Sequence, residues 1–203
     1  MLLEKPEKTR GITKERIIRV LLNHSEEEVT KYRVSKLADV SEPWCREYTE
    51  KLEEKGLIQD TEVLKPLELY KHWREIRIDP SQLEVSIQQP MELLQETDLK
   101  YSLTTYQAEN LHQGFLFPSS TDFYIAPNQI EDWLKIVEQK GMIGGGNTRI
   151  KVIDDHVFHQ QTVIDGYSTV SVPQLILDLI DEGGPCEEAA EKLIDSFHGD
   201  QQW

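Results

Sequence analysis

The residues between positions 41 and 52 include the side chains best suited to reading DNA bases. Cys45, Tyr48 and Leu52 recur at i, i+3 and i+7, so this segment is predicted to be a helix with one buried face. Arg46 lies off that face. A guanidinium can donate two parallel hydrogen bonds to the edge of a guanine, so Arg46 is the candidate for base recognition.

Other side chains around this helix are suited to phosphate contacts, which hold a protein in register on the duplex. Trp44 fits two roles equally well. One is contact with DNA, at a thymine methyl or over the backbone sugar, and the other is packing against the wing or the first helix. Glu47 and Glu50 would face phosphate groups unfavourably. The candidate DNA-binding residues are Lys31, Arg33, Lys36, Ser41, Trp44, Arg46, Glu47 and Lys51.

The elements around these residues predict a winged helix-turn-helix over residues 1–78. Val34, Leu37 and Ala38 form the apolar stripe of a short helix, and Ser41 is a good N-cap for the next helix. The remaining elements are a helix over residues 13–22, a loop over 23–31, a wing over 57–64 and a connector helix over 66–76. A plain three-helix bundle that docks on a protein partner would show the same pattern.

Residues 79–89 are polar and are predicted to be a linker to a second domain over residues 90–203. That domain mixes helical and strand patterns, so the fold class is α+β with a mixed α/β C-terminal domain. Predicted helices cover residues 102–111, 130–140, 173–182 and 187–197, and predicted strands cover 123–125, 150–153, 163–164 and 169–171. Few core contacts are expected across the linker, so we expect the two domains to fold independently.

Asp154, Asp155, His156 and His159 form the one cluster of metal-ligand residue types. The local pattern is strand-like, and residues i and i+3 of a strand point to opposite faces. We therefore expect no metal site here. No Ser/His/Asp or Cys/His arrangement follows from spacing, and the three glycines from position 144 lack the lysine of a phosphate-binding loop. We expect neither catalysis nor a cofactor.

Charge is distributed unevenly along the chain. The formal net charge is −15, yet residues 1–60 carry 12 Lys and Arg against 13 Asp and Glu, whereas the rest carries 10 against 24. Because non-specific binding to nucleic acid depends on neutralising phosphates, the acidic second half argues against it. A specific operator could still bind the first half, with modest and salt-dependent affinity.

Other features of the sequence bear on location. No apolar run reaches the length of about 18 residues that a membrane span needs. The first six residues lack the apolar core of a signal peptide. Cys45 and Cys186 are far apart and form neither a disulfide framework nor a zinc site. We expect a cytoplasmic protein that binds no membrane.

A further motif lies near the C-terminus. The turn Asp165-Gly166 is followed by VSVPQLILDL at 170–179 and GGPCEEAAEKL at 183–193. These residues resemble the C-terminal signature of the AbiEi-type antitoxins, the transcriptional-regulator half of type IV toxin–antitoxin systems. The order of residues 101–104, 123–125 and 157–158 and the segment 69–73 are similar as well, so the resemblance covers most of the chain.

The resemblance implies a winged-helix regulator that represses its own operon through promoter repeats. It also implies a C-terminal domain that antagonises a nucleotidyltransferase-like toxin, directly or indirectly. Two functions therefore stand side by side. One is a sequence-specific transcriptional repressor bound to double-stranded promoter DNA, and the other is a non-catalytic adaptor that uses the winged helix to dock on a protein. The operator, any effector and the oligomeric state, a dimer included, stay open.

Overall fold

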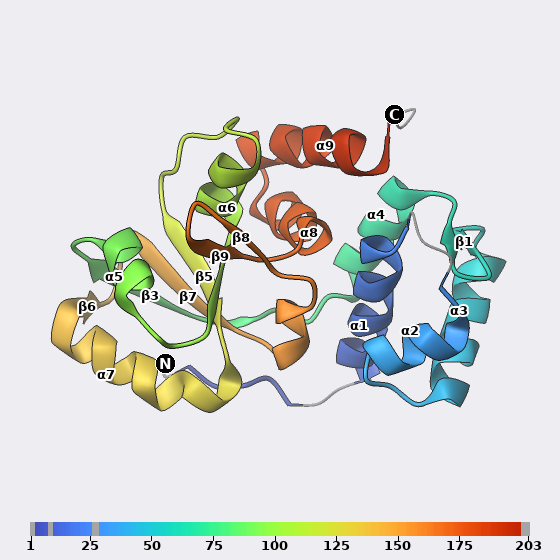
Figure 1. Cartoon of the computed structure of the whole chain (residues 1–203), viewed down its shortest axis with the longest axis horizontal. Helices are drawn as coiled ribbons and strands as arrows, with labels where there is room; N and C mark the ends of the chain where they lie inside the picture. The colour runs from blue at the N-terminus through green and yellow to red at the C-terminus, as the bar shows by residue number, and fades with distance from the viewer. Residues whose placement is uncertain (1–2, 8–9, 26–28, 200–203) are drawn as a thin grey trace.

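The computed structural model describes residues 3–7, 10–25 and 29–199, and it contains both helices and a seven-stranded sheet (Figure 1). The prediction of an α+β fold is therefore confirmed. Residues 26–28, in the middle of the predicted loop 23–31, lie outside the described residues.

Residues 10–76 form a helical part that we call the N-terminal unit. Its elements are α1 (Arg10–Asn23), α2 (Lys31–Leu37), α3 (Glu42–Glu54), the strands β1 (Ile58–Gln59) and β2 (Glu62–Val63), and α4 (Pro66–Ile76). The two strands pair antiparallel with Ile58 opposite Val63. At the hairpin tip Asp60 has a φ of 56°, and the Thr61 hydroxyl donates a hydrogen bond to the carbonyl of Val29. This bond ties the hairpin to the segment that leads into α2.

The apolar spacing predicted how α3 is rotated. Cys45, Tyr48 and Leu52 are all buried, as the sequence indicated. Ser41 precedes α3 in an extended conformation and Pro43 lies in the first turn, where no N–H partner is needed. The Ser41 hydroxyl makes no capping hydrogen bond, so Ser41 is an N-cap by position only.

The rest of the chain is built on a seven-stranded sheet and is called the sheet unit (residues 81–198). In spatial order the strands are β6 (Gly141–Ile143), β3 (Ser81–Ile87), β7 (Thr148–Val152), β5 (Thr121–Ile125), β4 (Tyr101–Thr104), β9 (Tyr167–Thr169) and β8 (Thr162–Ile164). The β5–β7 and β4–β9 pairs are parallel and the other pairs are antiparallel. Asp165 and Gly166, both at positive φ, make the predicted tight turn between β8 and β9.

Two sequence predictions about this unit are wrong. The segment 79–89 is not a linker, because β3 occupies residues 81–87 and lies between β6 and β7. Leu83, Val85 and Ile87 are buried and alternate with more exposed residues, which is the period of a strand. The predicted helix over 102–111 is wrong at its start, because residues 101–104 form β4.

The helices of the sheet unit cover both faces of the sheet. They are α5 (Pro90–Glu96), α6 (Thr105–His112), α7 (Ile130–Lys140), α8 (Val172–Glu182) and α9 (Pro185–His198), with short 3-10 helices η1 (Pro127–Gln129) and η2 (Asp155–Phe158). On β5, the Phe123 ring centroid lies 5.1 Å from that of Trp133 on α7, whereas the next residue, Tyr124, donates a hydrogen bond to Asp178 on α8. Successive strand residues point to opposite faces, so α7 and α8 lie on opposite sides of the sheet.

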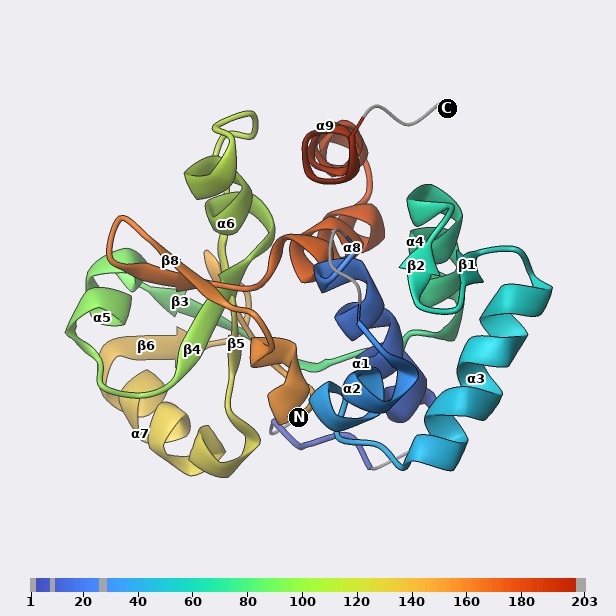
Figure 2. The same ribbon diagram turned by 45° about the vertical axis from the view of Figure 1, so that its right-hand side comes forward.

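The N-terminal unit and the sheet unit meet along α8, which lies between the sheet and helices α1 and α4 (Figures 1 and 2). Arg19 of α1 is buried there, and its guanidinium donates to Gln174 over 2.9 Å. Directly after α4, Arg77 pairs with Asp178 and Asp181 of α8. The expectation that few core contacts cross between the two halves is therefore wrong.

Candidate nucleic-acid interface

The outer face of α3 lies on the side of the N-terminal unit that points away from the sheet (Figure 2). Its exposed side chains follow the helical repeat opposite the buried stripe, and they are Pro43, Arg46, Glu47, Glu50, Lys51 and Glu54. A helix of 13 residues is roughly 20 Å long. The structure therefore presents an uncovered, largely charged helix surface at the edge of the molecule.

Arg46 and Lys51 are exposed cations on this face, each held in an ion pair with a glutamate four residues earlier. The Arg46 guanidinium donates two hydrogen bonds to Glu42, at 3.1 and 2.8 Å, and the Lys51 ammonium lies 2.6 Å from a Glu47 carboxylate oxygen. Both cationic side chains are more than half exposed. Water screens ion pairs that are this exposed, so either cation can exchange its glutamate for another acceptor.

Trp44 packs within the N-terminal unit. Its indole N–H donates a hydrogen bond of 3.0 Å to the Thr13 hydroxyl on α1. Its ring stacks on Tyr48 with an interplanar angle of 12°. Of the two roles that the sequence left open for Trp44, the structure has the packing against the first helix.

Lys31 also has a structural role. Its side chain is 16% exposed, and its ammonium lies 3.0 Å from Glu53 at the end of α3 and 3.5 Å from Asp60 at the hairpin tip. The Lys31 backbone carbonyl accepts a weak hydrogen bond from the Cys45 thiol. The position of its ammonium between two carboxylates does not favour the phosphate contact predicted for Lys31.

The other predicted phosphate-binding residues are exposed. Arg33 and Lys36 lie on the outer side of α2, and Lys36 lies 5.3 Å from the centre of the Tyr32 ring. Ser41 is exposed at the turn between α2 and α3. Sequence reasoning missed Lys65, which is exposed directly after the hairpin and has no ion pair with the described residues. A lysine that follows the return strand of a predicted wing was the available signal.

The cluster of Asp154, Asp155, His156 and His159 does not lie on the strand that the sequence predicted. His156 lies on the 3-10 helix η2 rather than on a strand, and the rings of His156 and His159 stack at 4.8 Å on one side. The Arg19 guanidinium donates to Nδ1 of His156, which leaves Nε2 of that ring to donate to the Leu37 carbonyl. Burial, reinforced by the charge of Arg19, lowers the pKa of His156 to about 2. Both ring nitrogens are therefore occupied and the ring is neutral.

Through its hydrogen bonds to Arg19 and to the Leu37 carbonyl, His156 connects α1 and α2 to η2. Among the described residues, no group of three or more His, Cys, Asp or Glu side chains could hold a metal ion. The buried carboxylate of Asp154 completes the connection. It accepts a hydrogen bond of 2.6 Å from Arg16 of α1 and caps η2 through the backbone N–H of His156.

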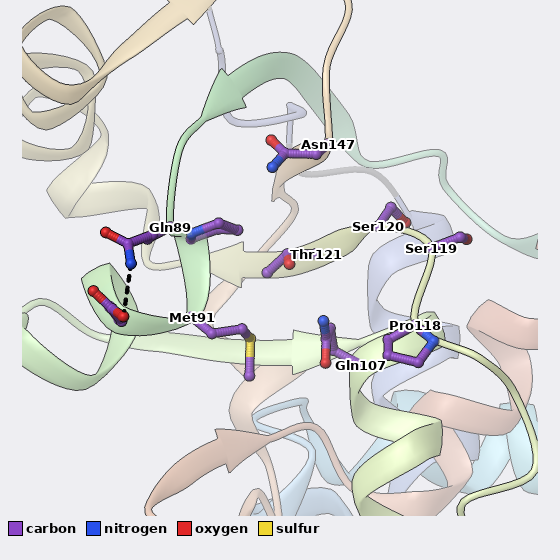
Figure 3. Close-up of a pocket in the computed structure, with 10 residues that line it drawn as sticks. Gln89, Met91, Gln107, Pro118, Ser119, Ser120, Thr121 and Asn147 are labelled. Atoms are coloured by element: carbon purple, nitrogen blue, oxygen red, sulfur yellow. Dashed lines mark hydrogen bonds between the residues drawn. The ribbon is translucent and has the colours of Figure 1, made fainter.

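A separate cavity of about 330 Å³ lies between the start of α5 and the segment that leads into β5 (Figure 3). Its lining is mostly neutral, with amides, hydroxyls and two prolines. The carboxylate of Glu92 accepts a hydrogen bond from the Gln89 amide, and the Asn147 side chain pairs with both backbone groups of Ile87. The lining holds no cation and no general base apart from Glu92, so it provides no catalytic group pair.

Comparison with protein-family models, with curated proteins and with solved structures finds no match to this chain. Among the described residues no helix has both the length and the apolar character of a membrane span.

Proposed function

We propose that the N-terminal unit is a winged helix-turn-helix and that the protein is a sequence-specific DNA-binding transcriptional regulator. One observation carries this proposal. The inner face of α3 is buried while its outer face is covered by no other described part of the chain. A regulator of this class inserts such a face into the major groove and holds the duplex with residues on either side.

The exposed side chains divide into two roles in this proposal. The Arg46 guanidinium leaves its ion pair with Glu42 and donates hydrogen bonds to the edge of a guanine. Glu47 can accept a hydrogen bond from a cytosine amino group. Arg33, Lys36, Lys51 and Lys65 contact phosphates, with Ser41 between them. Four phosphate contacts give a slope of log Kobs against log salt of about −3.6, so affinity falls roughly 150-fold between 50 and 200 mM salt.

The resemblance to the AbiEi-type family supports a narrower proposal, an autorepressor that binds repeats in its own promoter. The first test is therefore fluorescence anisotropy of the labelled upstream region of its own gene, at 50 and 200 mM salt, against a scrambled duplex. We expect specific binding with the salt dependence given above. Equal affinity for both duplexes contradicts sequence-specific recognition.

Arg46→Ala tests the base-reading role. We expect it to weaken specific binding by about 1–3 kcal/mol, roughly 5- to 150-fold in Kd, and to leave stability unchanged. Lys135→Ala is the matched control, because Lys135 is an equally exposed cation in a local ion pair on α7, on the opposite side of the molecule from α3. Equal binding by the two variants contradicts the assignment of Arg46.

A second function is favoured by the carboxylates on the same surface. Glu47, Glu50 and Glu54 on α3, with Asp60 and Glu62 on the hairpin, give the face a mixed charge. A docking module for a basic protein would use these groups and would bind no duplex. No measurable binding of the upstream DNA at 50 mM salt supports this adaptor and contradicts the regulator.

A further inference from the structure

A polar cavity of about 350 Å³ lies where the two units join. Its walls come from the segment 77–80, which connects α4 to β3, from the centre of β7 and from the C-terminal half of α8. Three cations and four carboxylates line it, apart from Pro80 and Gln82. The cavity is separate from the outer face of α3 and from the neutral cavity beside α5.

Both arginines in the lining are fully engaged. Arg77 is 4% exposed and pairs with Asp178 and Asp181. Arg149 pairs with the buried Asp122 beside it on β5, and its other arm lies 2.9 Å from Glu182. These ion pairs are contacts within the protein, and they leave neither guanidinium in need of a further anion.

Lys151 differs from these arginines. It is 7% exposed on β7 and has no hydrogen bond or ion pair with any described residue. Strand alternation puts it on the same face as Arg149, between Gln82 of β3 and Tyr124 of β5. Its charge acts on the carboxylate of Asp178 without a direct hydrogen bond, and the side chain borders a cavity large enough to hold a small molecule.

Asp79 is the complementary group. It is exposed at the rim of the same cavity, and its carboxylate has no ion pair or hydrogen bond with the part of the chain that the structure describes. Once the internal ion pairs are made, the lining therefore keeps one ammonium in its wall and one carboxylate at its edge.

We propose that this cavity binds a small zwitterion of the amino-acid class, with its carboxylate on the Lys151 ammonium and its ammonium toward Asp79. A simple anion would lie among four carboxylates, and a simple amine would lie among three cations. A molecule that carries both charges meets a complementary group at each end. This site does not depend on the proposed DNA-binding function, and its test uses no DNA.

The test is isothermal titration calorimetry of the full chain with the twenty standard α-amino acids, β-alanine and γ-aminobutyrate. Acetate, propionate, ethylamine and propylamine serve as matched compounds with one charge. We expect at least one zwitterion to bind with one-to-one stoichiometry, and the single-charge compounds to bind at least tenfold more weakly. Failure of every zwitterion to bind, or equal binding of a single-charge compound, overturns the proposal.

Variants then assign the binding to this cavity. Lys151→Met, which keeps the length of the side chain, is expected to weaken the best zwitterion at least tenfold, while Lys135→Met on α7 leaves it unchanged. Asp79→Asn changes an exposed residue and is expected to weaken the zwitterion several-fold. If Lys151→Met does not fold, the affinity of Asp79→Asn decides whether the zwitterion binds in this cavity. The site is overturned if folded Lys151→Met, or Asp79→Asn, binds the zwitterion with the same affinity as the parent chain.

Discussion

Replacement of Arg77 by methionine tests whether buried ion pairs hold the two units together. The Arg77 guanidinium contacts Asp178, Asp181 and the Tyr124 hydroxyl. Methionine fills much of the same space but removes the ion-pair partner of Asp178, whose side chain is fully buried. Removal of one partner of a buried ion pair costs about 3–5 kcal/mol, and the part-exposed Asp181 adds little because water screens it. We expect the free energy of unfolding to fall by about 3–5 kcal/mol.

Arg74→Met is the matched control for this change. Arg74 lies near the end of α4, 3.3 Å from the same Asp181, but its side chain is half exposed. An exposed ion pair is worth at most about 1 kcal/mol. Both variants are compared with the parent by urea unfolding at pH 7, followed by tryptophan fluorescence and circular dichroism. A difference of less than about 1 kcal/mol between the two variants refutes the reasoning.

The pH dependence separates charge from packing. Burial is the largest influence and raises the pKa of the Asp178 carboxyl, but the charges of Arg77 and Lys151 and the hydrogen bonds from Thr104 and Arg77 together keep that pKa below the ordinary 3.8. A depressed folded pKa gives stability that is present above the unfolded pKa and lost as pH falls. In Arg77→Met the pKa of Asp178 rises instead, so acid relieves the unpaired charge. The gap between variant and parent should shrink from pH 7 to pH 4, and a constant gap would indicate lost packing.

Three further outcomes are expected. Leu52→Ala should lower the free energy of unfolding by about 2–5 kcal/mol, because the Leu52 side chain on α3 is fully buried. The control Glu54→Ala, on the exposed face of α3, should change that free energy by less than about 0.5 kcal/mol. An unchanged urea midpoint for Leu52→Ala would mean that a different face of α3 is buried. Burial lowers the pKa of His159 and of His198 to about 4, so both rings contribute stability above the unfolded value of 6.5 that is lost as pH falls toward 4. Urea unfolding from pH 7 to pH 4 should therefore show a shallower loss in the His159→Gln/His198→Gln variant than in the parent, and parallel curves would rule this out. The fragment 90–203 should not fold alone, because it lacks β3 between β6 and β7, and a cooperative thermal transition of that fragment would contradict this.

Features set by local sequence were predictable. The stripe of Cys45, Tyr48 and Leu52 fixed the rotation of α3, since burial of one helix face repeats every 3.6 residues. The turn at Asp165 and Gly166 was equally local, because both residues have positive φ and Asp-Gly is a favoured pair for a two-residue hairpin turn of that kind.

Features set by distant pairing were not predictable in the same way. The strand β3 was missed because its polar residues dominate the composition, although Leu83, Val85 and Ile87 alternate correctly. Its place between β6 and β7 depends on partners about 60 residues away. Similarly, Thr105 follows directly after β4 with a φ of 48°, a conformation that is rare for a β-branched residue and that the sequence does not predict.

The candidate site was predicted only where it depends on local periodicity and not on packing between distant segments. Exposure of Arg46 follows from helix periodicity, but the ion pairs of Lys31 with Glu53 and Asp60 come from the packing of α2 against α3 and the hairpin. The stacked rings of His156 and His159 depend on a 3-10 helix that no periodicity in so short a segment can predict.

The segment that most resembles the AbiEi-type signature is also the segment that joins the two units. Residues 170–179 make up most of α8, where Gln174 meets Arg19 and Asp178 meets Arg77. These polar residues are buried at the junction, so packing against α1 and the end of α4 is sufficient reason for their presence. In α9 the exposed members of the signature are Pro185, Glu187, Glu188, Glu191 and Lys192. A partner that recognises the folded signature therefore meets the acidic outer face of α9, and substitutions in α8 act on it through stability rather than contact.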